Sequence, residues 1–304
     1  MGGFGIISVV RKERIMVFNC YKYTSLKYGI RSLIDGEFKV TAPAEFNDPL
    51  DCVGIVTMEN PPREALVDYA ATLARPSGQS VDDVLDSILQ GLSFPAHMNS
   101  ELLSRRVVSK TLRVMSLSDA NRCDPNSEQL LWSHYADNAK GVRIRLVIDT
   151  EYPLPTLTDK KMWSVRRVSY PQDGNLPLFD MKSLKTYPMD QGLLQFYHVC
   201  VFTKGHGWAY ENEIRLVVSA NDGCCRKAKS HPEDAKGTSA DVIDIPRSWV
   251  KGIDFGIQVE EGLVQACVQQ LVAAGYDINF RWARAAADQY GYSYWNLDKD
   301  GLPQ

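Results

Sequence analysis

Two carboxylates and a guanidinium alternate with other residues in the segment Glu211-Asn-Glu213-Ile-Arg215. The apolar positions 214, 216 and 218 predict a β-strand that turns one side toward a core. Glu213 and Arg215 then share the opposite side, and Glu211 joins them if the extended backbone reaches that far. Two carboxylates on one side of a strand suit general acid–base chemistry or the stabilisation of a developing positive charge. The alternative is a solvated strand with an ion pair worth about 0–1 kcal/mol.

Basic and aromatic residues stand directly before this strand, in the run Lys204-Gly-His-Gly-Trp208-Ala-Tyr210. Large aromatic side chains beside charged ones indicate the rim of a pocket rather than open surface. We therefore expect the segment from Lys204 to Arg215 to form part of a functional site.

Two segments nearer the N-terminus carry groups that could meet a ligand. Residues 21–25 (Tyr-Lys-Tyr-Thr-Ser) lie at the end of an expected strand and the start of a helix, a place that suits an anionic or stacked ligand. The alternative is a pair of half-buried tyrosines beside a helix cap. Residues 46–51 (Phe-Asn-Asp-Pro-Leu-Asp) either form a turn, because the Asn47 and Asp48 side chains can bond nearby backbone, or contribute to a site.

Two candidates lie in the middle of the chain. Ser116 and Ser118 alternate on an expected strand, where serines are commonly polar edge residues. His134 lies on an expected helix and is either a hydrogen-bonded structural histidine or a catalytic one.

The rest of the chain alternates strands and helices that must position these groups. Strands are expected at 17–23, 38–41, 112–118, 141–148, 165–170 and 214–218, and helices at 26–35, 63–74, 81–92, 126–138 and 264–272. With no repeat and no evident linker, we expect one α+β domain over 16–284, with a split mixed or antiparallel sheet and helical insertions. Residues 1–15 are expected as a poorly ordered extension, 221–239 as an exposed excursion and 285–304 as a tail.

Composition excludes several classes of protein. The 34 basic and 37 acidic side chains give a net charge of −3, so a generally basic nucleic-acid coat is absent, although a local basic groove stays open. No apolar run reaches the roughly 18–20 residues of a membrane span. The seven cysteines and five histidines show no metal-ligand spacing. We expect a cytoplasmic protein with reduced thiols and no metal.

Taken together, several of these segments resemble the bacterial family known as Domain of Unknown Function 2971. The matching segments follow the family's order across about residues 20–256. They are Tyr-Lys-Tyr at 21–23, Phe-Asn-Asp-Pro at 46–49, Ser-Leu-Ser at 116–118, Leu-Trp-Ser-His-Tyr-Ala-Asp at 131–137 with Lys-Gly-Val at 140–142, and Lys204 with Trp-x-Tyr-Glu-x-Glu-x-Arg at 208–215. The family label itself implies no activity.

A more distant resemblance, to toxin-type ADP-ribosyltransferases, does imply one. These enzymes order their site as an aromatic, His or Arg residue on the first strand, Ser-x-Ser on a middle strand and Glu-x-Glu on a late strand, and the same order occurs here. Lys22 stands where the DNA-modifying toxins have His, and the first strand carries no Arg. The resemblance implies an ADP-ribosyltransferase-like domain with NAD as co-substrate and no metal.

The same resemblance assigns roles to the candidate residues. Glu213 is expected to hold the ribose and to stabilise its positive charge, and Glu211 to orient or deprotonate the acceptor, although the two roles could be exchanged. Nicotinamide is expected to stack on Tyr21 or Tyr23, and the pyrophosphate to contact Lys204 or Arg215. The full set of residues expected to contact NAD is Tyr21, Lys22, Tyr23, Thr24, Ser116, Ser118, His134, Lys204, Trp208 and Arg215. Acceptor contacts are expected from Asn47, Asp48 and Tyr210.

The implied function is NAD-dependent ADP-ribosyl transfer by a bacterial toxin or anti-phage defence effector. Its acceptor would be RNA, DNA or protein, with an antitoxin protein as a further partner and no membrane. Two alternatives stay open. One is a hydrolase that does not use NAD, such as a metal-independent nuclease built on His134, Lys204 and the glutamates. The other is a module that binds a nucleotide or a partner protein without turnover.

Overall fold

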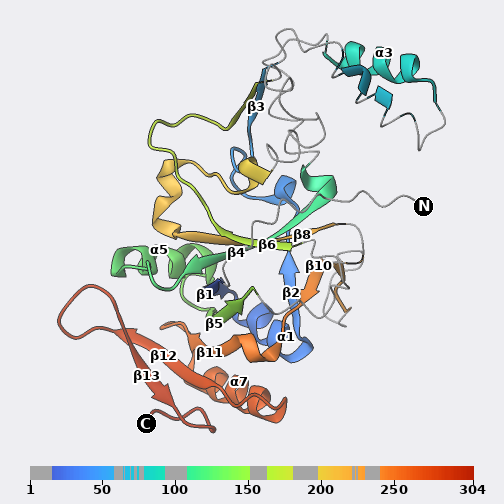
Figure 1. Ribbon diagram of the computed structural model, residues 1–304. Helices are drawn as coiled ribbons and strands as arrows, with labels where there is room; N and C mark the ends of the chain where they lie inside the picture. Colours follow the sequence, from blue (N-terminus) through green and yellow to red (C-terminus); the bar gives the residue numbers. More distant parts are fainter. Residues whose placement is uncertain are drawn as a thin grey trace. The chain divides into compact units, whose positions relative to one another are not determined.

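The computed structural model describes residues 16–57, 64, 66–68, 70–71, 74, 79–92, 108–150, 163–180, 198–220, 223, 225–229 and 240–304 (Figure 1). They form two compact units, the first from the described residues of 1–36, 119–161 and 244–304, and the second from those of 37–118 and 162–243. Each unit combines helices and strands, as the expected α+β class requires. The chain passes from one unit to the other repeatedly, which is why no single linker marks a boundary in the sequence. The extension expected at 1–15 lies outside the described residues.

The sheet of the first unit has the order β13-β12-β11-β5-β1. Its strands are β1 (Val17–Thr24), β5 (Val142–Asp149), β11 (Val250–Phe255), β12 (Asn279–Ala285) and β13 (Tyr292–Leu297). β11 and β12 pair in parallel, because α7 (Glu261–Ala273) provides the crossover connection that a parallel pair needs. The other pairs are antiparallel. Residues 285–304, expected as a tail, instead contribute the strand β13.

Helix ends in the first unit follow local signals. α1 (Leu26–Asp35) ends at Gly36, whose φ of 73° is the left-handed conformation that glycine adopts readily. α5 (Pro125–Tyr135) begins at Asp124, whose side chain accepts hydrogen bonds from two backbone N–H groups. α5 was expected to reach residue 138 but ends at Tyr135, because residues 137–139 have φ angles between 51° and 61° and cannot continue a right-handed helix.

The second unit is built around β8 (Glu213–Ser219), which pairs antiparallel with β4 (Leu112–Asp119) on one side and β6 (Trp163–Arg167) on the other. A second sheet has the order β2 (Glu37–Val40), β10 (Asp241–Asp244) and β9 (Arg226–Lys227), and β3 (Ile55–Thr57) pairs with β7 (Leu178–Asp180). Helical segments are η1 (Pro43–Glu45), α3 (Val81–Leu92) and η3 (His206–Glu211), and η4 (Arg247–Trp249) belongs to the first unit. The expected excursion at 221–239 contains β9, and most of it lies outside the described residues.

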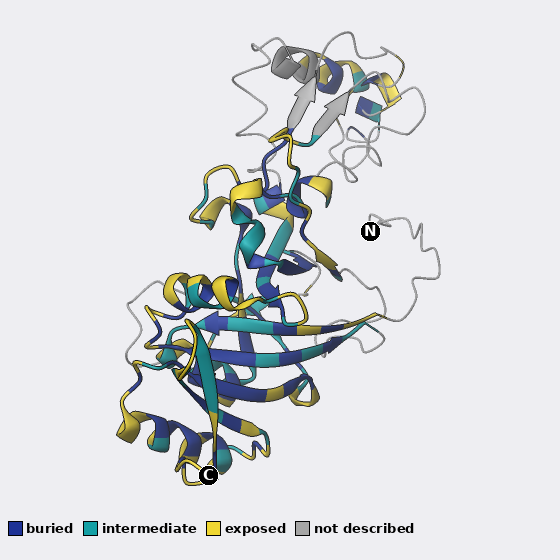
Figure 2. Cartoon of the chain, turned by 90° about the vertical axis from the view of Figure 1, so that its left-hand side faces the viewer, coloured by how far each residue is buried: buried dark blue, intermediate teal, exposed yellow. Residues whose placement is uncertain are grey.

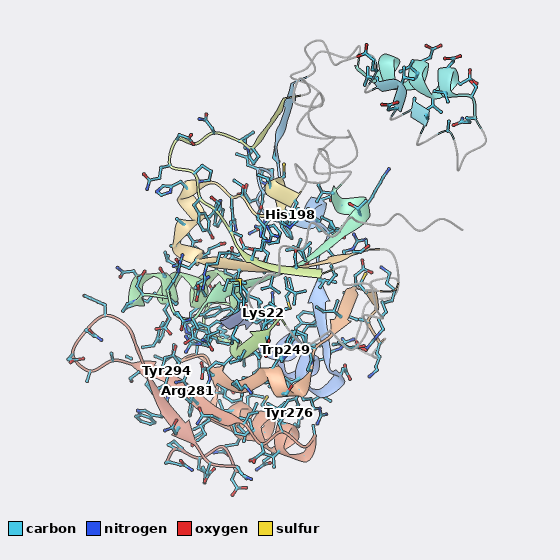
Figure 3. All side chains as sticks on the ribbon, in the orientation of Figure 1. Lys22, His198, Trp249, Tyr276, Arg281 and Tyr294 are labelled. Atoms are coloured by element: carbon cyan, nitrogen blue, oxygen red, sulfur yellow. The ribbon has the colours of Figure 1, made fainter. Side chains whose placement is uncertain are left out.

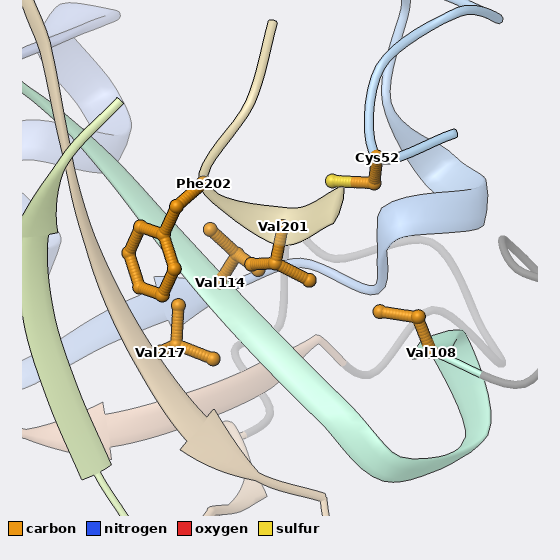
Figure 4. Packing of buried hydrophobic residues seen from close by; sticks show 6 residues of the cluster. All are labelled: Cys52, Val108, Val114, Val201, Phe202 and Val217. Atoms are coloured by element: carbon orange, nitrogen blue, oxygen red, sulfur yellow. The ribbon is translucent and has the colours of Figure 1, made fainter. Parts of the chain in front are cut away.

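Every residue of β8 is buried, so both sides of this strand are covered. Its even-numbered apolar residues occupy one side, as the alternation predicts. Val217 occupies the other and packs in a cluster with Cys52, Val108, Val114, Val201 and Phe202 (Figure 4). The solvated strand face that the sequence left open is therefore absent.

Buried residues concentrate in the strands of both units, and exposed ones on outer helix faces and loops (Figure 2). Within the part of the chain that the structure describes, no helix combines the length and apolarity needed to cross a membrane.

Candidate functional site

Five ionisable side chains meet in the interior of the second unit: Asp51, Lys204, Glu211, Glu213 and Arg215. We call them the acid–base cluster. Each is at most 7% exposed. Moving charged groups out of water is expensive unless they are paired, so a cluster of this kind needs close partners to exist.

Arg215 is the centre of the acid–base cluster. Its guanidinium donates to both carboxylate oxygens of Glu213, at 2.8 and 2.9 Å, and to Asp51 Oδ2 at 2.6 Å. It also donates to the carbonyl oxygen of Val201 at 2.6 Å and contacts Cys52 Sγ at 3.3 Å. Arg215 is 0% exposed, and its guanidinium bonds protein groups. These bonds orient the Glu213 carboxylate.

Lys204 connects the two glutamates. Its Nζ donates to Glu211 Oε2 at 2.6 Å and to Glu213 Oε2 at 3.4 Å, and lies 3.7 Å from Asp51 Oδ2. The ammonium also lies 4.7 Å from the ring centroid of Trp208, a cation–π arrangement. Glu211 is not on β8 as expected: it ends η3, and Asn212, with φ 44°, turns the chain before the strand begins. Lys204 nevertheless brings the two carboxylates together.

The two serines of β4 lie beside Glu213, as their strand positions predict. Ser118 is directly opposite Glu213 in the β4–β8 register, and Ser116 is opposite Arg215. Residues directly opposite in an antiparallel pair share one side of the sheet. The Ser116 hydroxyl donates to the Glu213 carboxylate. Met115 and Leu117 face the other side, opposite apolar residues of β8.

The cluster keeps Glu213 ionised. Burial alone would raise the pKa of this carboxyl, but the Arg215 guanidinium, followed by the Lys204 ammonium, lowers it from 4.5 to about 2. For Lys204, burial opposes the charge, and the two glutamates outweigh it and raise the pKa. The site therefore holds an anionic carboxylate and a cationic amine at neutral pH.

A depressed pKa links this carboxyl to acid stability. Because the folded state binds the proton more weakly than the unfolded chain, Glu213 stabilises the fold above about pH 4.5, and this stabilisation is lost as the pH falls toward about 2. We expect Glu213→Gln to flatten the fall in unfolding free energy over that interval, measured by urea unfolding at several pH values. Glu45→Gln, at an exposed position of the same unit, is the control. An unchanged slope for Glu213→Gln would contradict the pairing described here.

Other candidates of the second unit have local roles in the described structure. Asn47 Oδ1 accepts from the Asp48 backbone N–H at 3.0 Å, and Asp48 Oδ1 accepts from the Leu50 N–H at 2.9 Å. These bonds form the turn that leads into Asp51, and Asp51, the last residue of the candidate segment 46–51, is the one that joins the acid–base cluster. Tyr210 is partly buried and its ring lies 6.2 Å from that of Trp208.

The candidates from the first strand and from α5 belong to the first unit. Tyr23 is 6% exposed, packs edge-on against Trp132 and accepts a hydrogen bond from Arg143. Tyr21 and Thr24 are half-buried, and Lys22, labelled in Figure 3, lies on the other side of β1 from the tyrosines. His134 is exposed in the last turn of α5. The buried ring of Tyr23 leaves Tyr21 as the tyrosine with more surface for stacking.

Sequence reasoning missed a second polar group, on one side of the first unit's sheet. We call it the arginine–aromatic face, and it comprises Tyr21, Tyr23, Arg143, Arg145, Asp254, Arg281, Tyr292 and Tyr294. Its available signals were the alternation of Arg143 and Arg145 with apolar residues and the aromatic residues at 290–295. Neither signal says that three guanidiniums meet at one carboxylate.

The two groups of side chains offer different chemistry. The acid–base cluster pairs carboxylates with one amine and suits proton transfer or the stabilisation of a cation. The arginine–aromatic face carries excess positive charge and suits an anion. Among the described residues, no group of three or more His, Cys, Asp or Glu side chains is arranged to hold a metal ion.

Comparison with known proteins finds a family model that matches part of the chain. No curated protein and no solved structure matches it. A family model described as "Protein of unknown function (DUF2971)" matches residues 131–216, which contain the end of α5, all of β5 and β6 and the start of β8, including Lys204, Glu213 and Arg215. Over residues 131–216 this chain therefore matches the DUF2971 family, and the match supports the family resemblance expected from its sequence motifs.

Proposed function

We propose that the acid–base cluster carries out NAD-dependent ADP-ribosyl transfer, with Glu213 as the principal carboxylate. The observation that supports this most directly is the hydrogen bond from Ser116 to Glu213, with Ser118 directly opposite on the neighbouring strand. Serines that support a glutamate from an adjacent strand are what the Ser-x-Ser and Glu-x-Glu order leads one to expect.

The proposed chemistry uses charges that the cluster already holds. Cleavage of NAD breaks the bond between ribose C1′ and the nicotinamide nitrogen, and the electron pair leaves with nicotinamide. Positive charge then develops on the ribose, and an ionised carboxylate at that position lowers the barrier. The low pKa of Glu213, caused by Arg215 and Lys204 against the effect of burial, keeps it in the ionised form required.

Glu211 and Lys204 fit the second half of the reaction. The acceptor must lose a proton as its nucleophile bonds to ribose C1′, and Glu211 can take that proton. Lys204 Nζ lies 2.6 Å from the Glu211 carboxylate, whereas its contact with the Glu213 carboxylate is longer, at 3.4 Å. A ribose hydroxyl would replace the longer contact at Glu213, while Lys204 stays bonded to Glu211 and Arg215 keeps Glu213 in place.

One experiment separates this proposal from the alternatives. The purified full chain is incubated with NAD labelled in its adenylate part, and nicotinamide release and label transfer to RNA, DNA and lysate protein are measured. Transfer to any acceptor supports the proposal, and growth arrest on expression of the wild type would add the toxin or defence role. Nucleic-acid cleavage without NAD would support a hydrolase. Binding with no nicotinamide released on any acceptor would overturn the proposal in favour of a binding module.

A further inference from the structure

The arginine–aromatic face is built across neighbouring strands. Arg143 on β5 is directly opposite Tyr23 on β1 and Asp254 on β11, and Asp254 is opposite Arg281 on β12. Because side chains alternate along a strand, Arg145 shares this side of the sheet with Arg143. The residues come from distant parts of the chain, and the register brings them into adjacent rows on one side of the sheet.

Positive charge exceeds negative charge at this face. Asp254 receives Arg143 Nε at 2.7 Å, Arg281 Nε at 2.7 Å and Arg281 Nη2 at 3.0 Å. Arg145 Nε lies 3.3 Å from the same carboxylate. A second carboxylate, Glu128 on α5, pairs with Arg143 and accepts from the Tyr294 hydroxyl. Three guanidiniums thus share two carboxylates, and an anion would balance the remaining charge.

The excess charge is accessible at two of the three arginines. The Arg143 side chain is 2% exposed, whereas those of Arg145 and Arg281 are 21% and 23% exposed. Burial lowers the pKa of Arg145. The Asp254 carboxylate raises this pKa, but the positive charges of Arg281 and Arg143 oppose that effect, and the pKa remains below its usual value. Its buried Nε has no hydrogen-bond partner among the described residues. Arg145 is therefore the guanidinium whose charge is least compensated, and Arg281, although paired with Asp254, is the other guanidinium that solvent reaches.

Gly252 makes room for this arrangement. A Cβ on Gly252 would lie 2.0 Å from Arg145 Nη2, so any side chain there would displace the guanidinium. Arg145 is held over β11 by bonds from Nη2 to the backbone and side-chain oxygens of Asn279. The position of Arg145 is thus fixed by the backbone of two neighbouring strands.

Aromatic rings flank the guanidiniums. The Arg281 guanidinium lies 4.7 Å from the ring centroid of Tyr294, and both residues are labelled in Figure 3. The Arg143 guanidinium lies 4.2 Å from the ring of Tyr21. Tyr21 and Tyr292 are half-buried, so part of each ring meets solvent. Arginines beside partly exposed tyrosines provide both a charge and a stacking surface.

We propose that the arginine–aromatic face binds the phosphate of a nucleotide through Arg145 and Arg281, with the base stacked on Tyr21 or Tyr292. A guanidinium can donate two parallel hydrogen bonds to a phosphate, and every base has a face that stacks on an aromatic ring. The nucleotide is either free or part of a single strand. This site lies in the first unit and does not depend on the reaction proposed for the acid–base cluster.

Binding is tested with the full chain and no NAD. Fluorescence anisotropy follows labelled single-stranded RNA and DNA of about 12 nucleotides, a length within the usual site size, and unlabelled ADP is titrated separately by calorimetry. We expect Arg145→Gln and Arg281→Gln each to weaken binding by about tenfold or more, the loss of one charge-assisted contact. Affinity should also fall as salt rises.

The controls make each outcome decisive. Lys251→Gln removes the same charge from an exposed position of β11 and should change affinity by less than about twofold. Arg145→Lys keeps the charge but not the paired donors, and should weaken binding while circular dichroism stays unchanged. Binding of strands alone identifies a single strand as the ligand, and binding of ADP alone a free nucleotide. No binding of either, or an equal loss with Lys251→Gln, would overturn the inference.

Discussion

Glu213→Gln is expected to lower ADP-ribosyl transfer by about 10²-fold or more, the effect of removing one preorganised charged group from a catalytic site. Glutamine has nearly the same size and keeps an oxygen that can accept from Arg215, but it has no charge to stabilise the ribose cation. Initial rates of label transfer from NAD, measured at neutral pH for the wild type and the variant, give the ratio directly.

The charges of the cluster indicate that this variant will fold. The wild type has the carboxylates Asp51, Glu211 and Glu213 against the cations Lys204 and Arg215. Without the charge of Glu213, two carboxylates remain for two cations, so no cation is left unpaired. Circular dichroism and the urea midpoint should therefore show a folded protein, and loss of activity can be assigned to the missing charge.

Glu211→Gln provides the contrasting measurement. Because Glu211 is proposed to act on the acceptor, its loss should depress transfer more than it depresses hydrolysis of NAD to nicotinamide. Glu45→Gln, at an exposed position of the same unit, should leave both rates within about twofold of the wild type. Full transfer activity in Glu213→Gln would contradict the proposed role of that residue.

Local patterns predicted much of the secondary structure. β1, α1, β5, β8 and α7 lie close to where alternation and helical spacing predicted them. These elements have strong local signals, since their apolar residues repeat at the period of a strand or a helix. By contrast, β11 and β13 were not predicted. Apolar and polar residues do not alternate regularly in these two segments, and they form strands because a neighbouring strand pairs with them.

The candidate site was predictable only in part. Glu213, Arg215 and Ser116 lie on one side of their strands, because the register follows from alternation. The burial of that side was not predictable, since it depends on Asp51, Cys52 and Val201 from distant segments. Arg143 shows the same limit. The sequence places it on a polar side of β5, but its partners Glu128, Asp254 and Tyr23 come from three other elements.

Arg215→Met is expected to destabilise the second unit by about 3–5 kcal/mol, the usual cost of removing one partner from a buried ion pair. Arg215 is 0% exposed and bonds both Asp51 and Glu213. Methionine would fill much of the volume but would leave three buried carboxylates with Lys204 as their remaining cationic partner in the cluster. Urea unfolding followed by circular dichroism measures the change.

Two comparisons test whether charge pairing, rather than packing, causes this loss. Lys227→Met breaks an ion pair with Asp241 in which the lysine side chain is 67% exposed, so it should cost no more than about 1 kcal/mol. Adding Asp51→Asn to Arg215→Met removes one of the uncompensated carboxylates and should recover part of the lost stability. If the double variant is as unstable as the sum of the single ones, the two side chains are not coupled. Arg215 would then stabilise the unit mainly by filling space beside Val201 and Cys52.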